Sequence, residues 1–253
     1  MTEAVNLVDR IFVILEYLSV ESEPKGPTEI AQATGLNKST VYRLLSSMSA
    51  RGYIEKEANG TYRIGVKVIE IASNHINNLE LHAEARPYLN ELHNELGLAV
   101  YLGKLDHDEV VYLDKIDISR SLRVYAQIGM RVPAYCSSLG KCTLANMSGD
   151  DLDYLLHSIE LAHFTENTIV SKTQLKEHLR QVRRQGWAMD DQEYIMGNRC
   201  IGAPIFDYRG EVIAAISASG PKTMIEDDQV LKVADRVVKA AKEISRRLCY
   251  RDR

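Results

Sequence analysis

Two short amphipathic segments separated by Gly35-Leu36-Asn37 constrain the fold of this chain more than any other feature. Pro27 and Thr28 mark the start of the first, with Thr28 as the expected helix N-cap, and the segment 29–34 stops at Gly35. The second segment, capped by Asn37 and closed by Gly52, places its apolar residues on one face: Val41, Leu44, Leu45 and Met48. A glycine in so tight a turn sets the second helix at a steep angle to the first, which is typical of a helix-turn-helix.

A β-hairpin is predicted directly after these two helices. Residues 53–56 and 61–64 have strand-like sequences and flank Asn59-Gly60, which is the strongest short-range hairpin signal. A further helix is expected before Pro24, because apolar residues repeat there on one face: Val5, Val8, Phe12 and Leu15, with Ile11 and Leu18 beside them. The hairpin makes the predicted helix-turn-helix a winged one.

The second helix of this motif is predicted to recognise DNA. Once its apolar face is turned to the core, these polar side chains remain outward: Lys38, Ser39, Thr40, Tyr42, Arg43, Ser46 and Ser47. Arg43 can pair with O6 and N7 of guanine, and Lys38 near the helix N-terminus suits a phosphate. Thr40 and Ser47 can reach base edges or phosphates, and Arg63 on the hairpin can follow the adjacent backbone or minor groove. The alternative is a generic helical domain whose polar face is merely solvated.

Charge favours a local nucleic-acid interface over a global one. The chain has 31 Lys and Arg against 35 Asp and Glu, a net charge of −4, so no overall positive field attracts DNA. Residues 35–67 reverse this balance, because they hold only two acids, Glu55 and Glu57, against these basic residues: Lys38, Arg43, Arg51, Lys56, Arg63 and Lys67.

A cytoplasmic location is expected. No apolar run is long enough to span a membrane, and residues 1–9 lack the basic and then apolar pattern of a signal peptide. The 4 cysteines are too few for a disulfide framework in a chain of 253 residues, which agrees with a reducing compartment.

The rest of the chain predicts an α+β domain. Helices are expected over residues 66–77, 138–157 and 172–185, over a segment that carries Ala85, Leu89, Leu92 and Leu96 and ends at Gly97, and over a final amphipathic segment from Val230 to Leu248. Strand-like stretches are 98–105, 109–116, 187–190, 199–206 and 211–219, and residues 122, 124, 126 and 128 alternate in the same way. Strands joined by hairpins, with segregated helices, indicate an antiparallel sheet with flanking helices.

Several motifs then resemble the IclR family of bacterial transcription regulators over nearly the whole chain. The first is the stretch from Leu36 to Leu45 with Gly52-Tyr53 after it, and further motifs follow in the family's order: Tyr135 to Lys141, Gln185-Gly186-Trp187, Asp190 to Glu193, Gly197 to Ile201, Pro204 to Asp207 and Ile216 to Pro221. Val111 to Asp117 and Leu122 to Gly129 look most like the subgroup that regulates sugar-acid catabolism, such as the 2-keto-3-deoxygluconate repressor.

This resemblance implies a winged helix-turn-helix over residues 1–65, a linker helix over 66–78 and a GAF-like effector domain over 79–253. It also implies dimers, or dimers of dimers, on palindromic double-stranded operators, with no cofactor. Carried over motif by motif, the effector-binding positions are Ser138, Leu139, Asp190, Asn198, Cys200, Ser217 and Ser219. The sequence departs from the family at Cys136 and Ser138, where many relatives have small residues, and at Gln192, which replaces a common acid.

The residue chemistry of these positions suits a small polyhydroxy or keto acid. Ser217 and Ser219 are two apart on a strand, so both hydroxyls point to one face and can donate to a carboxylate. Asp190 can accept from ligand hydroxyls, and the helix that follows Cys136-Ser137-Ser138 offers backbone N–H groups to an anion. The alternative is that both serines satisfy local backbone groups and Asp190 only caps a turn.

Other site chemistries have weaker support, and no catalytic or metal-binding residue is expected. A zinc site could draw on Cys136, Cys142 and Cys200 with His157 and His163, but no ligand spacing typical of zinc occurs. Cys200 lacks a histidine in the neighbouring motifs, so a buried structural thiol is favoured over a nucleophile. Asp190, Asp191 and Glu193 cluster in what reads as a solvated turn instead of on opposed elements, as acid–base catalysis would require.

The predicted function is therefore an effector-responsive transcriptional regulator. Relief of repression by the ligand is favoured through the subgroup resemblance, and activation is the alternative. An enzyme with an accessory helical domain would need a nucleophile motif or a cofactor loop, and the sequence contains neither. A constitutive DNA-binding structural protein would leave the long second domain without a role.

Overall fold

The computed structural model describes residues 7–77, 80–117 and 127–250. By its internal contacts the chain divides into two compact units, Met1–Asn78 and Leu79–Arg253. In the described ranges, no helix has the length and apolarity that crossing a membrane would require.

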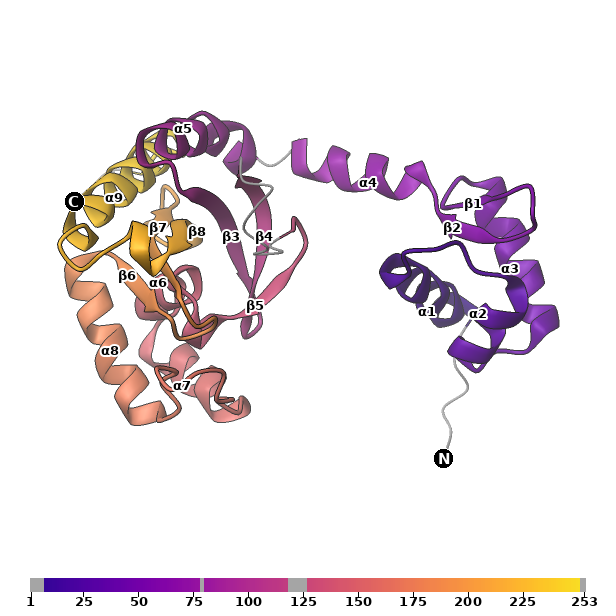
Figure 1. Ribbon diagram of the computed structural model, residues 1–253, viewed down its shortest axis with the longest axis horizontal. Coiled ribbons are helices and arrows are strands. Elements are labelled where there is room, and N and C mark those ends of the chain that lie inside the picture. Colours follow the sequence, from indigo (N-terminus) through magenta and orange to yellow (C-terminus); the bar gives the residue numbers. More distant parts are fainter. Residues whose placement is uncertain (1–6, 78–79, 118–126, 251–253) are drawn as a thin grey trace. The chain divides into compact units, whose positions relative to one another are not determined.

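The first unit contains the predicted helices and hairpin (Figure 1). Its elements are α1 (Leu7–Val20), α2 (Pro27–Thr34), α3 (Lys38–Ala50), β1 (Ile54–Lys56), β2 (Tyr62–Ile64) and α4 (Val66–Asn77). Gly35 has a φ of 67° and ends α2 in the left-handed conformation, as the turn requires. Strands β1 and β2 pair antiparallel, and the backbone N–H of Gly60 donates to Glu57 in the turn between them. The winged helix-turn-helix prediction is confirmed.

Two local details of the first unit differ from expectation. Helix α2 starts at Pro27 with Gly26 as its N-cap, so Thr28 as N-cap was wrong; Pro27 has no N–H that would need a partner, and the Glu29 carboxylate accepts the N–H of Gly26 at 2.7 Å. Asn37 does precede α3 as predicted, but its side chain makes no capping hydrogen bond.

The predicted apolar face of α1 is confirmed only in part. Leu18 is buried, and Ile11 and Leu15 pack against the core of this unit, whereas Val8 and Phe12 are 50% and 55% exposed. Ile14, which the prediction left out, is buried, because both sides of this helix are apolar. Val5, which belongs to the same predicted face, lies outside the described residues.

The second unit is built on a six-stranded antiparallel sheet in the order β5-β4-β3-β8-β7-β6. The strands are β3 (Ala99–Asp106), β4 (Glu109–Ile116), β5 (Arg131–Pro133), β6 (Ala188–Asp191), β7 (Asn198–Phe206) and β8 (Val212–Pro221). The helices are α5 (Glu80–Leu96), α6 (Ser138–Asn146), α7 (Gly149–Ser158), α8 (Lys172–Gln185) and α9 (Val230–Arg247). The α+β prediction is confirmed.

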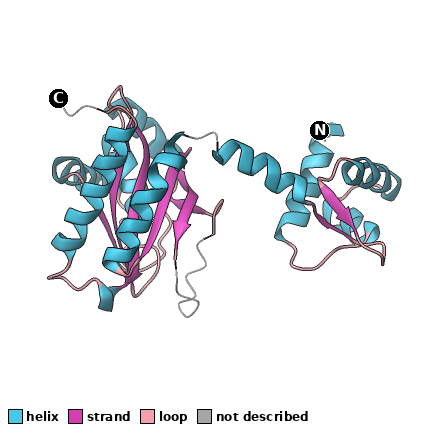
Figure 2. Ribbon diagram, turned by 90° about the horizontal axis from the view of Figure 1, so that it is seen from above, coloured by secondary structure: helices cyan, strands magenta, loops and turns pink. Residues whose placement is uncertain are grey.

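The sheet lies between two layers of helices, each with its own core (Figures 1 and 2). Helices α5 and α9 pack side by side on one face, over alternate strand residues such as Leu102 and Ile216. Helices α6 and α8 cover part of the other face, over Tyr101 and Ala215. Period-two alternation along β3 and β8 therefore divides each strand between the two layers.

Two predicted segments of the second unit differ in detail. The single helix expected over residues 138–157 is two helices. Helix α6 ends before Met147, whose backbone is extended, and the Ser148 side chain caps α7 by accepting the N–H of Asp151. The short strand β5 was not predicted, and of the alternating positions proposed before it only Ile128 is described; it lies outside the strands, and the other positions lie outside the described residues.

Candidate functional site

Helix α3 presents one apolar and one polar face, as predicted. Val41, Leu44, Leu45 and Met48 are all buried in the core of the first unit. On the opposite face the side chains of Lys38, Ser39, Tyr42, Arg43 and Ser47 are exposed and that of Thr40 is half-buried. Within the described part of the chain, neither Lys38 nor Arg43 forms a salt bridge, so both cations face solvent with their charge uncompensated by a partner.

Arg63 on the wing differs from these two cations. Its guanidinium lies 3.2 Å from the Glu55 carboxylate on the paired strand and 3.4 Å from the carboxylate of Glu57. Two carboxylates therefore offset the positive charge of Arg63 on the free protein, and binding to a phosphate would have to replace these pairs.

All seven predicted effector positions line one cavity of about 410 Å³ in the second unit. We call it the serine cavity, after Ser138, Ser217 and Ser219. The seven residues come from the start of α6, the end of β6, the start of β7 and the end of β8, so the fold joins four separate segments of the chain. A cavity of this size is typical of small-molecule sites.

The N-terminus of α6 is held close to the sheet by two glycines. A Cβ at Gly140 would lie 2.2 Å from the carbonyl oxygen of Ala134, and one at Gly202 on β7 would lie 3.1 Å from the carbonyl carbon of Ser138. The Ser137 hydroxyl caps the helix by accepting the N–H of Gly140. The N–H groups of Ser138 and Leu139 belong to the first turn of α6 and have no partner within the helix, and both residues line the cavity.

Asp190 is only 5% exposed and lines the cavity. Burial raises the pKa of its carboxyl to about 7, although the positive charge of Lys141 and a hydrogen bond from the backbone N–H of Glu193, at 2.7 Å, both act to lower it. Near neutral pH the carboxyl is therefore partly protonated and can donate as well as accept. The carboxylate also caps the turn by accepting the N–H of Glu193. Asp190 therefore both caps a turn and lines the cavity, so the two interpretations do not exclude each other.

The turn that holds Asp190 is not a solvated one, contrary to expectation. Glu193 is also buried, and it pairs with Lys141, which has no exposed surface. Of the three carboxylates Asp190, Asp191 and Glu193, only that of Asp191 retains substantial exposure. Both its oxygens accept hydrogen bonds from Arg199 at 2.9 Å. Asp190 and Glu193 are buried because this turn packs against Lys141 of α6 and against the segment that carries Thr165 and Thr168, which its polar sequence does not indicate.

Asn198, Cys200 and Ser219 form a hydrogen-bonded group at one side of the cavity. The Asn198 amide donates to the Cys200 sulfur at 3.1 Å and to the Ser219 hydroxyl at 3.2 Å, and the Cys200 thiol donates to Ser219 at 3.1 Å. Burial raises the pKa of Cys200, so its thiol stays protonated and is a poor nucleophile. Because Ser219 already accepts from two donors, its own proton is left to donate.

The hydroxyls of Ser138 and Ser217 make no hydrogen bond to any described residue, although both residues are buried. The alternative in which these serines satisfy local backbone groups therefore does not apply to Ser217. Such hydroxyls in a cavity wall are available to a ligand.

Two positions at which the sequence departs from the family do not line the described part of the cavity. The Gln192 side chain instead accepts the N–H of Gly197 across the loop, and the Cys136 thiol donates to the carbonyl of Pro133. Only Ser138 of the three departures reaches the cavity.

Sequence reasoning missed the aromatic walls of the serine cavity. Tyr101 and Tyr112 pack with ring centroids 5.0 Å apart, and Phe164 and Tyr194 pack edge to face at the same separation. Burial raises the pKa of Tyr101 to about 12 and also raises that of Tyr112, so both phenols remain neutral donors. For Tyr101 and Tyr112, the only available sequence signal was the alternation along β3 and β4.

In the described part of the chain, no three side chains of His, Cys, Asp or Glu gather as metal ligands would. Cys136 and Cys142 are buried in the core between α6 and the sheet, and burial raises both thiol pKa values. A zinc site built from Cys136, Cys142 and Cys200 with the two histidines is therefore not formed.

Comparison with known proteins agrees with this geometry. The family model for the IclR helix-turn-helix domain matches residues 7–58, and the model for the bacterial transcriptional regulator IclR C-terminal domain matches residues 73–246. The chain is 36% identical to the HTH-type transcriptional regulator KdgR of Escherichia coli over 251 residues, or 99% of this chain and 95% of KdgR. This similarity supports the resemblance to the sugar-acid subgroup.

Two further comparisons agree with the match to the two family models. The chain is 36% identical to the transcriptional repressor IclR of Escherichia coli over 247 residues, which cover 96% of this chain and 90% of the repressor. It superposes on the crystal structure of Thermotoga maritima IclR with a TM-score of 0.85 at 29% identity, covering 96% and 98% of the two chains. The two Escherichia coli relatives are named as transcriptional regulators, and the family model matched at the N-terminus is that of a helix-turn-helix domain. The chain belongs to the IclR family of bacterial transcriptional regulators.

Proposed function

We propose that this chain is the repressor of a catabolic operon, and that a small carboxylate bound in the serine cavity controls its affinity for the operator. The observation that carries the proposal is the convergence of seven polar or wall residues from four segments on one cavity, in a chain that also carries a helix-turn-helix. We assign residues 1–65 to DNA binding, 66–78 to the linker and 79–253 to effector binding. Its place of action is the cytoplasm, where operator DNA is found.

In this proposal the outward face of α3 enters the major groove. Arg43 reads guanine, Thr40 and Ser47 reach base edges or phosphates, and Lys38 contacts a phosphate beside the helix N-terminus. Ser39 and Tyr42 complete this surface. The exposure of Lys38 and Arg43 without salt-bridge partners among the described residues supports the assignment, whereas Arg63 must exchange its glutamates for phosphate and contributes less.

The effector carboxylate is received by the free N–H groups of Ser138 and Leu139 at the start of α6. Ser217 and Ser219 donate their hydroxyl protons, and the neutral form of Asp190 donates to, or accepts from, the adjacent oxygen of a keto or hydroxy acid. Burying a carboxylate without such donors would be prohibitively unfavourable, so the clustered donors support an anionic ligand. Asn198 and Cys200 hold Ser219 in its donating orientation.

We further propose that the protein acts as a homodimer or tetramer on a palindromic operator. The exposed face of α1, with Val8 and Phe12, and the exposed residues of α4, Val66 and Ile69 at 56% and 63%, give the first unit more apolar surface than a monomer needs. One recognition helix reads only a few base pairs, and a two-fold dimer doubles the readout. Replacing Phe12 with glutamate should shift sedimentation towards monomer, and a wild type that is already monomeric with a non-palindromic footprint would contradict this arrangement.

Regulation requires that the ligand bind one arrangement of the DNA-binding units better than another. We propose that the carboxylate favours the arrangement that misfits the operator, which relieves repression. The Escherichia coli relative named a transcriptional repressor supports this sign.

The test begins with selection of genomic DNA fragments by the purified protein, followed by operator titrations with and without sugar acids and keto acids. Calorimetry then compares wild type with Ser217→Ala/Ser219→Ala, and Ser158→Ala on the exposed end of α7 is the matched control. We expect the double variant to lose acid binding and to keep operator binding. Undiminished acid binding by the double variant would move the site elsewhere, and acid binding with no change in operator affinity would refute the coupling.

A further inference from the structure

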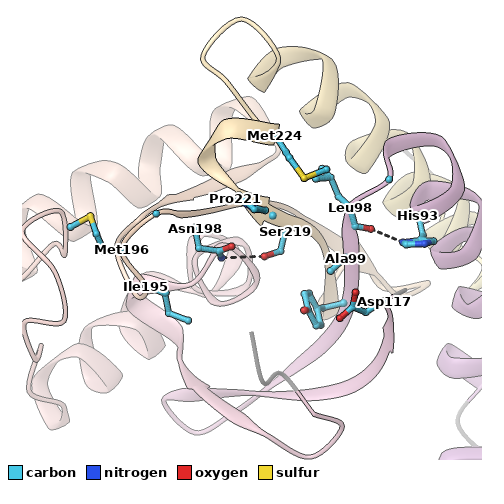
Figure 3. A pocket seen from close by; sticks show the side chains of 14 residues that line it. His93, Leu98, Ala99, Asp117, Ile195, Met196, Asn198, Ser219, Pro221 and Met224 are labelled. Carbon is cyan, nitrogen blue, oxygen red and sulfur yellow. Dashed lines mark hydrogen bonds between the residues drawn. The ribbon is translucent and has the colours of Figure 1, made fainter. Parts of the chain in front are cut away.

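A second cavity, of about 420 Å³, adjoins the serine cavity in the second unit (Figure 3). We call it the methionine cavity, and its apolar lining is Leu98, Ala99, Ile195, Met196, Pro221 and Met224. The polar side chains of its described wall include His93, whose Nδ1 donates to the Leu98 carbonyl at 2.7 Å, and Asp117. The methionine cavity is thus lined largely by hydrocarbon and thioether groups.

The two cavities meet at a common wall. Tyr101, Ile195, Asn198 and Ser219 line both of them. On β8, Ser217 and Ser219 line the serine cavity, and Ser219, Gly220 and Pro221 line the methionine cavity. Because alternate residues of a strand point to the same face, Ser217, Ser219 and Pro221 lie on one face of β8, and the methionine cavity continues from the serine cavity towards the end of this strand.

Large apolar side chains are exposed around the methionine cavity. Ile195, Met196 and Met224 are 41%, 52% and 49% exposed, although they lie within one small region. Exposed apolar surface that clusters around a concavity indicates a binding site, and methionine side chains adapt readily to ligands of different shape. The donors of the serine cavity, in contrast, are Ser138, Ser217 and the start of α6.

From this juxtaposition we propose that the effector is an amphipathic 2-oxo acid: its carboxylate and keto oxygen bind in the serine cavity, and an apolar tail extends past Ser219 into the methionine cavity. The proposal rests on the proposed function, since it takes the serine cavity as the site of the acid group. Within the carboxylates considered there, it favours acids with a hydrocarbon tail over fully hydroxylated sugar acids, whose hydroxyls would find few partners among the apolar side chains of the second cavity.

The experiment is calorimetry with a series of straight-chain 2-oxo acids, from pyruvate through 2-oxobutanoate to 2-oxooctanoate, with gluconate as the hydroxylated comparison. Each methylene that enters the methionine cavity should tighten binding roughly fourfold, the equivalent of about 0.8 kcal/mol of buried CH₂. Gluconate should bind more weakly than the longer 2-oxo acids. A dissociation constant that does not depend on tail length would overturn the proposal.

Ala99→Leu tests the location of the tail, because Ala99 lines only the methionine cavity and leucine is compatible with a strand. In this variant the affinity ratio between 2-oxooctanoate and pyruvate should collapse towards one. Ala83→Leu, the same substitution at an exposed site on α5 that lines neither cavity, should keep the wild-type ratio. Met224→Ala removes apolar wall surface and introduces no bulkier side chain, so it should weaken the binding of only the longer acids. It therefore tests the location of the tail even if Ala99→Leu does not fold.

The outcomes separate the two proposals. If pyruvate binds and loses its binding in Ser217→Ala/Ser219→Ala, while tail length has no effect, the proposed function stands and the amphipathic effector is refuted. If no 2-oxo acid or sugar acid binds at all, both are refuted. A wild-type length dependence that Ala99→Leu and Met224→Ala leave intact would place the tail elsewhere and overturn this inference.

Discussion

Replacing Asp190 with asparagine should remove a pH-dependent cost to the stability of the second unit. Burial raises the pKa of Asp190 from 3.8 to about 7 in the folded protein. Between these two values the folded state therefore keeps a proton that the unfolded chain has released. The folded state binds more protons in this window, so the free energy of unfolding falls as the pH rises through it.

The magnitude follows from the size of the shift. One pKa unit corresponds to about 1.4 kcal/mol, so the wild type should lose roughly 3 kcal/mol of unfolding free energy from this group between pH 5 and pH 8. Asparagine has no proton to release, and its Oδ1 can still accept the N–H of Glu193. The unfolding free energy of Asp190→Asn minus that of wild type should therefore grow by about 3 kcal/mol over this range.

Urea unfolding at several pH values measures this difference. The chain has 1 tryptophan, Trp187, which directly precedes β6 and reports on the second unit alone. Protein concentration is held constant because self-association would shift the apparent stability. Asp235→Asn, at an exposed site on α9, is the matched control and should show no such trend. A difference that stays constant from pH 5 to pH 8 would mean that Asp190 is ionised throughout in the folded protein, and the argument from burial would be wrong.

Three further outcomes are expected. The affinity of the wild type for a carboxylate, measured by calorimetry, should fall by up to about tenfold per pH unit above about pH 7, because ionised Asp190 repels the anion. In Asp190→Asn the affinity should hardly depend on pH. An equal pH dependence in both proteins would exclude Asp190 from the site. In operator titrations, Arg43→Ala should cost about 1–3 kcal/mol and relax specificity, whereas Lys38→Ala should weaken all sequences alike and flatten the salt dependence; wild-type affinity in Arg43→Ala would disprove the recognition-helix assignment. Gly140→Ala should destabilise the second unit by about 1–3 kcal/mol and weaken acid binding, because its methyl would meet the Ala134 carbonyl; unchanged melting and binding would show that α6 is not held as tightly as its contacts indicate.

Much of the secondary structure was predictable because its signals are local. Val41, Leu44 and Leu45 on α3 repeat at the helical period, and the alternation along 98–105 indicates a strand without any knowledge of its neighbours. Asn59-Gly60 indicates a hairpin from its backbone preference alone. Local preferences were insufficient where both sides of a helix are apolar, as on α1, where the pattern included the exposed Phe12 and left out the buried Ile14.

The candidate site was predictable only in part. The sequence by itself determined that Ser217 and Ser219 share one face of a strand, because the period of two is a property of the extended backbone. It also placed the start of a helix at Ser138, where α6 begins. The resemblance to the IclR family supplied the remaining positions, and the fold brought all seven to one cavity.

Only the tertiary structure decided the properties that depend on what packs around a residue. The burial of Asp190, and with it the raised pKa, follows from α6 lying against the turn that holds it. The Lys141–Glu193 pair joins residues 52 positions apart, and the aromatic walls and the methionine cavity are likewise formed by distant segments. Burial and electrostatic environment arise from contacts between elements, which no local pattern encodes. The sequence therefore indicated which side chains have the chemistry to bind an acid, and the packing determined the cavity and the electrostatic environment in which they lie.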